Sequence, residues 1–140
     1  MRRELPGGFE LDDDRGRVDI DAVHDFLSNE SYWAKGRARD EVERSVRDAA
    51  RVIGLYDNAR QIGFARVLSD DITIAYLADV YVLLEYRGRG LGVELVREAV
   101  DNGPHSKLRW WLGTDDAHGL YERFGFEAPG SRYMIRPRRD

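Results

Sequence analysis

The stretch Ala78–Asp101, ADVYVLLEYRGRGLGVELVREAVD, changes its residue pattern at a run of glycines. Before the glycines it is apolar and rich in β-forming residues, from Val80 to Leu84. After them, apolar residues recur at three- and four-residue steps, at Val93, Val96 and Val100. This pattern predicts a strand, a glycine loop and an amphipathic helix. Because the start of a helix presents free N–H groups and glycine has no Cβ, the loop is a candidate site for an anion.

Composition restricts the class of protein. The chain has 140 residues, 42% hydrophobic and 34% charged, which is typical of one globular domain spanning residues 1–140. It has no apolar run long enough for a membrane helix, and its start is charged where a signal peptide is apolar. We therefore expect a cytoplasmic protein without a membrane partner. A net charge of −4 argues against nucleic acid as the main partner.

Cysteine and histidine usage narrows the chemistry. No cysteine is present, so disulfides, cysteine-ligated metals and a covalent thiol intermediate are excluded. The three histidines, His24, His105 and His118, lack the spacing of a zinc site, and we expect no metal.

Periodicity and turn residues divide the chain into successive elements. Residues 1–8 are expected to be a flexible arm, and Asp19 is expected to cap the first helix. The expected elements are a short strand at 9–11, helices at 19–29 and 41–51, a hairpin over 52–68, strands at 72–82 and 108–112, a short helix at 116–124 and a last strand at 132–135. The strand at 72–82 is long enough to bend or bulge, and the strands flanking the glycine loop suggest a parallel crossover.

Two common phosphate-binding motifs do not fit the glycine loop. A dinucleotide motif, Gly-x-Gly-x-x-Gly, would need glycine at a position held by Val93 or Leu95. The Gly-Lys-Ser/Thr of a Walker loop does not occur. The sequence instead has Arg-x-x-Gly-x-Gly at Arg87, Gly90 and Gly92. Taken alone, this pattern leaves open a glycine-rich helix start that binds no ligand.

A second motif lies downstream, beyond one expected strand. Leu120–Phe126 reads LYERFGF, that is Leu-Tyr-x-x-x-Gly-Phe. In this order the two motifs resemble those of the GNAT acetyltransferase superfamily, over the chain from Val52 to Phe126 and by extension over the two N-terminal helices. The resemblance implies an α/β (α+β) fold with a mixed sheet of about six to seven strands, splayed at its centre and flanked by about four helices.

The resemblance implies acetyl-CoA as cosubstrate and assigns its contacts. Backbone amides of the glycine loop would hold the pyrophosphate, with added charge from its arginines; the loop residues are Arg87, Gly88, Arg89, Gly90, Leu91 and Gly92. Arg89 could equally be a solvated side chain. The strand at Val80, Tyr81 and Val82 would bond the pantetheine arm as an edge strand bonds an added strand. Thr114 stands where many family members have asparagine, and its hydroxyl could bond the cofactor with one donor fewer.

The resemblance also implies two catalytic roles. Tyr121 would be the general acid that protonates the thiolate leaving group, and the alternative for it is a core aromatic. Some relatives have a glutamate general base on the strand before the loop. Here that strand carries Asp79, which could act through water or could instead bond neighbouring backbone or a loop arginine.

An acceptor site is expected around Tyr32, Trp33 and Arg37, where aromatic and basic residues interleave in a segment without a clear period. The alternative is that these aromatics belong to the core. Aromatic walls would suit a cationic amine, whereas an arginine would suit a carboxylate-bearing acceptor, and the sequence does not choose between them.

The expected function is therefore N-acetyl transfer from acetyl-CoA to a primary amine of a small molecule or peptide, by direct attack in a ternary complex. The alternatives are transfer of a longer acyl group on the same fold and a non-catalytic CoA-binding module. The chain could also form a homodimer.

Overall fold

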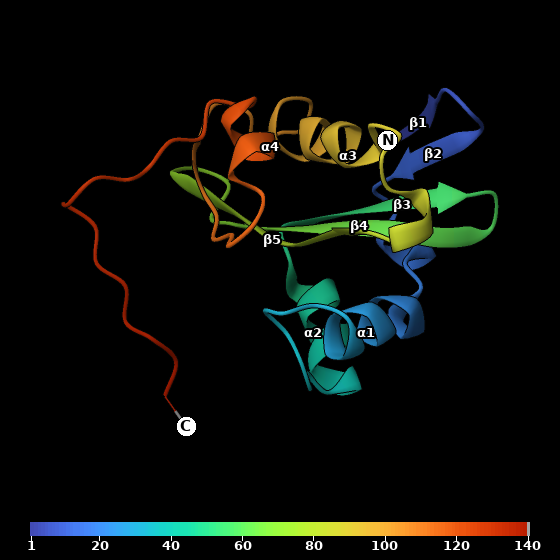
Figure 1. Ribbon diagram of the computed structural model, residues 1–140, viewed down its shortest axis with the longest axis horizontal. Coiled ribbons are helices and arrows are strands. Elements are labelled where there is room, and N and C mark those ends of the chain that lie inside the picture. Colours follow the sequence, from blue (N-terminus) through green and yellow to red (C-terminus); the bar gives the residue numbers. More distant parts are fainter. Residues whose placement is uncertain (140) are drawn as a thin grey trace.

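One sheet of six strands forms the centre of the molecule (Figure 1). The computed structural model describes residues 1–139. The strands lie side by side in sequence order as β1 (Arg2–Leu5), β2 (Phe9–Asp12), β3 (Arg51–Asp57), β4 (Arg60–Ser69), β5 (Ile74–Val82) and β6 (Arg109–Trp111). All neighbours are antiparallel except β5 and β6, which are parallel. This topology confirms the mixed sheet and the parallel crossover.

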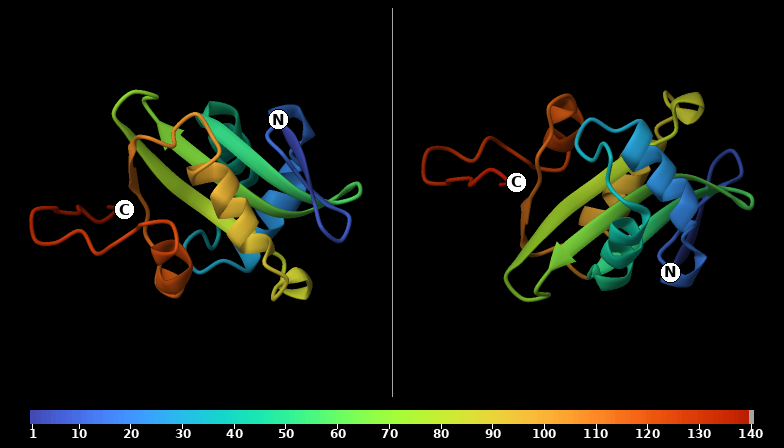
Figure 2. Two further views of the ribbon diagram at one scale, coloured as in Figure 1. Left: turned by 90° about the horizontal axis from the view of Figure 1, so that it is seen from above. Right: turned by 90° about the horizontal axis from the view of Figure 1, so that it is seen from below.

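Helices cover both faces of the sheet (Figures 1 and 2). They are α1 (Ile20–Asn29), α2 (Arg39–Asp48), α3 (Leu91–Val100) and α4 (His118–Glu122), with short 3-10 helices at Arg15–Arg17 and Leu84–Tyr86. α1 and α2 lie on one face, and α3 and α4 lie on the other. No helix in residues 1–139 is long and apolar enough to cross a membrane.

The predicted start of α1 is correct, whereas the bounds of α2 differ from the prediction. The Asp19 carboxylate accepts a hydrogen bond from the Ala22 amide at 3.0 Å, as an N-cap does. α2 ends at Asp48 because the chain has already joined the sheet at Arg51, which pairs with Val67. The β3–β4 hairpin forms as predicted.

Residues 1–8 are not a flexible arm, because Arg2–Leu5 form β1, which pairs with β2 along its whole length. Arg3 also anchors this strand to α3. Its Nε donates to Glu98 at 3.1 Å and its Nη1 donates to Glu94 at 3.2 Å. The Arg3 side chain therefore has partners within the fold.

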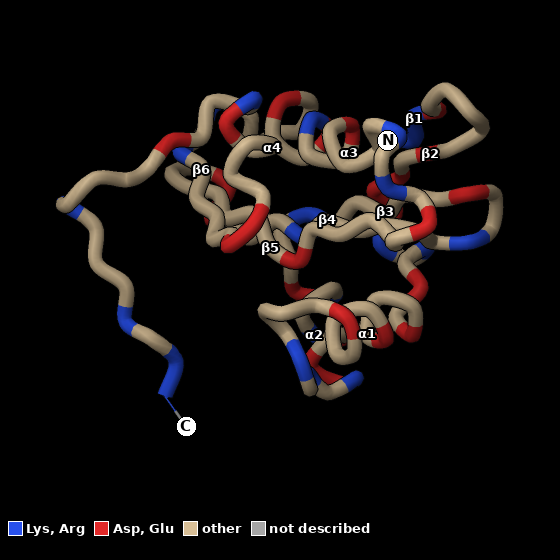
Figure 3. The backbone as a smooth tube through the Cα atoms, in the orientation of Figure 1, with Lys and Arg blue, Asp and Glu red and all other residues tan. Residues whose placement is uncertain are grey.

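The last strand expected at 132–135 is not formed. Beyond Phe126 the chain runs as an extended tail that leaves the body of the molecule (Figure 1), with basic residues spaced along it (Figure 3). The Tyr133 ring packs edge-on against Trp111, with the ring centroids 4.3 Å apart. Met134 and Ile135 are 97% and 91% exposed.

β5 carries a bulge that changes which side chains face α3. Its pairing with β4 shifts between Phe64 and Arg66, and Asp79 lies there with a φ of 56°. One extra residue reverses the alternation of side chains along a strand. Leu77 before the bulge and Val82 after it consequently pack in the same core. The predicted irregularity in this strand is confirmed.

The sheet separates two apolar cores. The core on the α3 side includes Leu95, Val96 and Ala99 of the helix with Ile53, Ile62 and Val67 of the sheet. The core on the other side joins α1 and α2 to β4 and β5, and the Phe26 and Tyr81 rings stack there at 4.0 Å. Tyr81 therefore fixes α1 against β5 through its side chain.

A buried ion pair joins α3 to β3. The Glu98 side chain is 4% exposed, and Nη2 of Arg51 donates to its carboxylate at 3.0 Å. Nη1 of Arg51 donates to the Glu98 carbonyl oxygen at 2.9 Å, and Nε donates to Asp13 at 3.1 Å. A buried charge that loses its partner is strongly destabilising, so the position of α3 depends on this pair.

We expect Glu98→Ala to lower the free energy of unfolding by about 3 kcal/mol, because it leaves the Arg51 guanidinium buried without its main partner. Urea denaturation measures this change. The matched control is Glu43→Ala, which removes an exposed pair with Arg39 on α2 and should change stability by less than about 0.5 kcal/mol. Equal effects of the two substitutions would contradict the role given to Glu98.

Candidate active site

The parallel strands β5 and β6 separate after a short paired stretch. Their register runs from Ile74↔Arg109 to Tyr76↔Trp111, where β6 ends. β5 continues to Val82 and has no strand on that edge within the described residues. The backbone from 77 to 82 thus has an edge that an added chain could pair with, except at the Val82 carbonyl, which accepts a hydrogen bond from the Arg87 side chain. This free edge contains the predicted pantetheine strand at 80–82.

The glycine loop leads from β5 into the start of α3. Gly88 and Gly90 have φ angles of 81° and 77°, which favour glycine. A Cβ at either position would meet no heavy atom within 4 Å, so the space beside the loop is open. The first helical bond within α3 joins the Glu94 amide to the Gly90 carbonyl at 3.2 Å. The amides of residues 88–93 form no backbone hydrogen bond and are consequently free to bind an anion, whereas the Arg87 amide donates to the Leu84 carbonyl.

The two loop arginines lie differently. Arg87 turns back onto β5, where its Nε donates to the Val82 carbonyl at 2.9 Å. Arg89 lies over the rings of Phe9 and Tyr86, at 5.9 and 5.6 Å from their centroids. Both side chains keep positive charge beside the free amides of α3, which suits an anionic ligand.

Tyr121 is buried on α4, with 9% of its surface exposed. Burial, and then the neighbouring Tyr32 and Asp116, raise the pKa of its hydroxyl to about 12. The hydroxyl is protonated at neutral pH, as an ordinary phenol is, and the raised pKa makes it a weaker acid. The role of Tyr121 as proton donor is therefore a proposal from its position. Its ring also packs edge-on against Phe126 at 5.9 Å, which contributes to holding it in place.

The segment with Tyr32 and Trp33 follows α1 and contacts both β5 and the turn before α4. The Tyr32 hydroxyl accepts a hydrogen bond from the Asp115 amide at 2.8 Å, just before α4. The Tyr32 and Trp33 rings meet edge-on at 5.1 Å. They are 47% and 40% exposed, so both rings border the surface instead of filling the core.

The Asp79 carboxylate, at the bulge of β5, accepts hydrogen bonds from three side chains. Nε of Arg66 and Nη1 of Arg37 donate to its Oδ2 at 2.8 and 3.0 Å. Nε1 of Trp33 donates to its Oδ1 at 2.9 Å. Its side chain is 2% exposed. A carboxylate with these donors has little capacity left for an amine proton. The geometry therefore favours the alternative expected for Asp79, a bond to a loop arginine, over the role of general base.

Thr114 and His118 lie near α4 and make local contacts. The Thr114 hydroxyl accepts a hydrogen bond from the Ala117 amide at 3.1 Å, so it contributes to the turn before the helix. His118 is exposed at the start of α4. Neither residue contacts the glycine loop, and the cofactor role of Thr114 stays a prediction.

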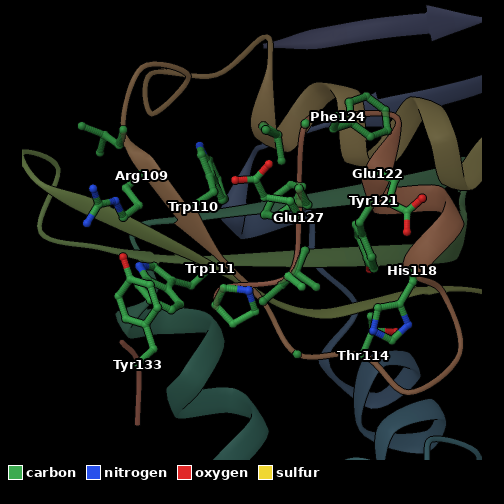
Figure 4. Close-up of a pocket in the computed structure, with 18 of the residues that line it drawn as sticks. Arg109, Trp110, Trp111, Thr114, His118, Tyr121, Glu122, Phe124, Glu127 and Tyr133 are labelled. Atoms are coloured by element: carbon green, nitrogen blue, oxygen red, sulfur yellow. The ribbon is translucent and has the colours of Figure 1, made fainter. Parts of the chain in front are cut away.

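A cavity of about 850 Å³ lies between β6, α4 and the C-terminal tail (Figure 4). Tyr121 and Thr114 are among its lining residues, with Trp110, Trp111 and Tyr133. Its lining does not include the glycine loop or the free edge of β5. The cavity therefore borders the candidate site at Tyr121 and is separate from the anion-binding part.

Two residues of this region were not predicted from the sequence. Arg66 lies on β4 and completes the group around Asp79. Tyr76 lies at the last pair before β5 and β6 separate and is 41% exposed. Arg66 had a signal in the sequence, because it is the one charged residue between Gln61 and Ser69 in an otherwise apolar strand.

Comparison with known proteins agrees with this architecture. The chain matches the family model described as Acetyltransferase (GNAT) family over residues 13–126. A solved structure from Xanthomonas campestris, described as belonging to the GNAT family, is 37% identical and superposes with a TM-score of 0.84, over 94% of this chain and 96% of that one.

Two curated proteins are more distant. A protein of Gibberella zeae whose name describes it as an acetyltransferase is 25% identical, over 86% of this chain and 80% of its own length. The peptidyl-lysine N-acetyltransferase YjaB of Salmonella typhimurium is 28% identical, over 81% of this chain and 73% of its own length. The glycine loop and the separation of β5 from β6 agree with these matches. The chain belongs to the GNAT acetyltransferase family, because the family model matches most of its length.

Proposed function

We propose that the chain is an N-acetyltransferase that moves an acetyl group from acetyl-CoA to the primary amine of a small molecule or peptide. The observation that carries this proposal is the separation of β5 from β6 beside the free amides of α3. An extended arm can pair with the free strand edge while its anionic end reaches the helix start. Tyr121 lies on α4, which follows β6 in the chain, and its side chain belongs to the same apolar core as Leu77 and Val82 of β5.

Acetyl-CoA fits the residues present at this place. Its pyrophosphate would bind the amides of residues 88–92, since open space at Gly88 and Gly90 lets phosphate oxygens approach the backbone. The Arg87 amide does not take part, because it donates to the Leu84 carbonyl at 3.2 Å. The two loop arginines add charge, and the pantetheine arm would pair with Val80–Val82. When bound, acetyl-CoA supplies a thioester with an electrophilic carbonyl and a thiolate leaving group.

In the proposed reaction the neutral acceptor amine attacks the thioester carbonyl. A carbon–nitrogen bond forms, the carbon–sulfur bond breaks, and Tyr121 gives its proton to the departing sulfur. The acceptor nitrogen loses its own proton to solvent water at the exposed Tyr32 and Trp33 surface, and water returns a proton to Tyr121. This route does not need Asp79 as a base.

The acceptor is an amine in this proposal, and the name of the Salmonella relative as a peptidyl-lysine N-acetyltransferase supports an amine. Acceptor binding is assigned to Tyr32, Trp33 and Arg37. Trp33 and Arg37 donate hydrogen bonds to Asp79, and the Tyr32 ring packs against Trp33. Transfer of a longer acyl group and a non-catalytic CoA-binding role are the alternatives. The cytoplasmic location and a homodimer stay predictions from the sequence.

The direct test of the proposal is release of free CoA from acetyl-CoA in the presence of single amines, amino acids and lysine peptides, with longer acyl-CoAs run in parallel. Faster release with acetyl-CoA than with longer donors supports acetyl transfer. Binding of acetyl-CoA without amine-dependent release from any acceptor would favour the non-catalytic alternative.

We expect Tyr121→Phe to lower kcat about a hundredfold or more, because the leaving thiolate loses its proton donor. The affinity for acetyl-CoA, measured by isothermal titration calorimetry, should stay within about twofold. Tyr56→Phe is the matched control, since the Tyr56 hydroxyl is buried without a partner and lies outside the site. Full turnover in Tyr121→Phe would exclude Tyr121 as the acid.

Gly92→Val should weaken acetyl-CoA binding at least about tenfold, because the new side chain occupies the space beside the helix start. Gly92 is the informative glycine, since its φ is not positive and a Cβ would lie 4.0 Å from the Val82 side chain. The free protein should consequently keep its Tm. An unchanged Kd together with an unchanged Tm would exclude the loop as the pyrophosphate site.

A further inference from the structure

The group around Asp79 carries more positive than negative charge. Arg37 and Arg66 both donate to the same carboxylate oxygen, at 3.0 and 2.8 Å. Within residues 1–139, neither guanidinium forms a salt bridge with any other acidic side chain. One carboxylate therefore faces two cations. This arrangement differs from the Arg51 cluster, where the guanidinium contacts two different carboxylates, those of Asp13 and Glu98.

Both arginines also keep unused donors. A guanidinium has five N–H groups, and Arg37 uses Nη1 and Arg66 uses Nε in the contacts with Asp79. Among the described side chains, the polar atoms that are buried and have no hydrogen-bond partner belong to Arg3, Tyr56 and His105, and none belongs to Arg37 or Arg66. The remaining N–H groups of Arg37 and Arg66 are therefore open to solvent, in agreement with side-chain exposures of 25% and 13%.

These donors lie at one end of the expected acceptor surface. Trp33 bonds Asp79 directly, and the ring of Tyr32 contacts Trp33. The Tyr32 hydroxyl in turn accepts a hydrogen bond from the Asp115 amide at 2.8 Å, just before the helix α4 that carries Tyr121. Two exposed rings thus separate the arginines from the proposed proton donor. A molecule with an amine at one end and an anion at the other fits this order of groups.

We infer that Arg37 and Arg66, held in place by Asp79, bind an anionic oxygen group of the acceptor, a carboxylate or a phosphate. Planar guanidinium groups bind such anions through paired, charge-assisted hydrogen bonds. The inference rests on the proposed acetyl transfer, because it names the class of acceptor for the same site. Asp79 acts as a positioning residue, since it fixes both arginines to the bulge of β5 without contacting the reacting atoms.

The activity test compares acceptors that carry an anion with matched neutral acceptors, and KM is expressed as the concentration of unprotonated amine because the anion also raises the pKa of the amine. Amino acids are paired with their amides, and phosphoethanolamine is paired with ethanolamine, and CoA release gives KM and kcat for each. The acidic member of at least one pair should have a KM at least about tenfold lower than its neutral partner. The pair with the larger ratio identifies carboxylate or phosphate as the group. Equal KM values within both pairs would overturn the inference.

Substitution of Arg37 tests the assignment to residues. Arg37→Gln should raise the KM of the acidic acceptor about tenfold more than it raises the KM of its neutral partner, so that the ratio between the two KM values falls by that factor. Arg37→Lys should restore part of the loss, because it keeps the charge and loses the planar fork. Arg44→Gln, on the exposed face of α2, is the control with the same change of charge. An equal loss for both acceptors in Arg37→Gln would contradict anion binding.

A binding test does not depend on turnover. The indole N–H resonance of Trp33 reports on the group, because this proton is donated to Asp79. Inorganic phosphate and glycine should shift it in a saturable way, and the shift should be lost in Arg37→Gln and Arg66→Gln but kept in Arg44→Gln. A resonance that neither ligand moves would overturn the inference even in an active acetyltransferase. A saturable shift in a protein without acetyl transfer would keep the anion site and reject the proposed function.

Discussion

The buried carboxylate of Asp79 is the contact on which the proposed acceptor side of the molecule depends. It receives hydrogen bonds from the segment after α1, through Trp33 and Arg37, and from β4, through Arg66. It can reach all of them because the bulge places Asp79 at a positive φ, a conformation that aspartate tolerates better than most residues. A single residue thus joins three parts of the chain at the point where β5 becomes a free edge.

The free edge itself follows from the shortness of β6. The parallel pairing ends at Tyr76 and Trp111, and the chain then turns toward α4. The opposite edge of β5 stays paired with β4 up to Val82, so the exposed backbone is held rigidly from behind. On the α3 side, the pair between Arg51 and Glu98 fixes the helix whose start carries the free amides. The strand β4 and the anchored helix α3 therefore support the edge of β5 that has no neighbouring strand.

Local sequence signals predicted the elements whose causes are local. The Asp19 cap, the β3–β4 hairpin and the glycine loop before α3 each depend on neighbours in the chain, and the structure confirms them. The glycine-loop motif around Gly90 and the downstream motif around Tyr121 together predicted the family, because two motifs in a fixed order are more specific than one. The identity of the elements around the site could thus be derived without coordinates.

What the sequence could not predict depends on contacts between distant residues. Arg3 is charged, yet it belongs to a strand because Glu94 and Glu98 lie above it. The role of Asp79 depends on Arg66, thirteen residues earlier, and on the bulge that turns its side chain toward the loop. The tail at 132–135 has a strand-like pattern but pairs with no strand in the described chain. The residue pattern of a segment indicates that it can form a strand, but whether the strand forms depends on a neighbouring strand with which it can pair.

The central claim is that the free edge of β5 and the glycine loop together form the acetyl-CoA site. Titration of the full chain with acetyl-CoA, followed by backbone amide NMR, tests this claim most directly. We predict the largest shift changes at residues 77–82 and 88–93, with a common binding constant. Shift changes confined to the residues around the cavity between β6 and the tail, or changes at only one of the two segments, would contradict the account.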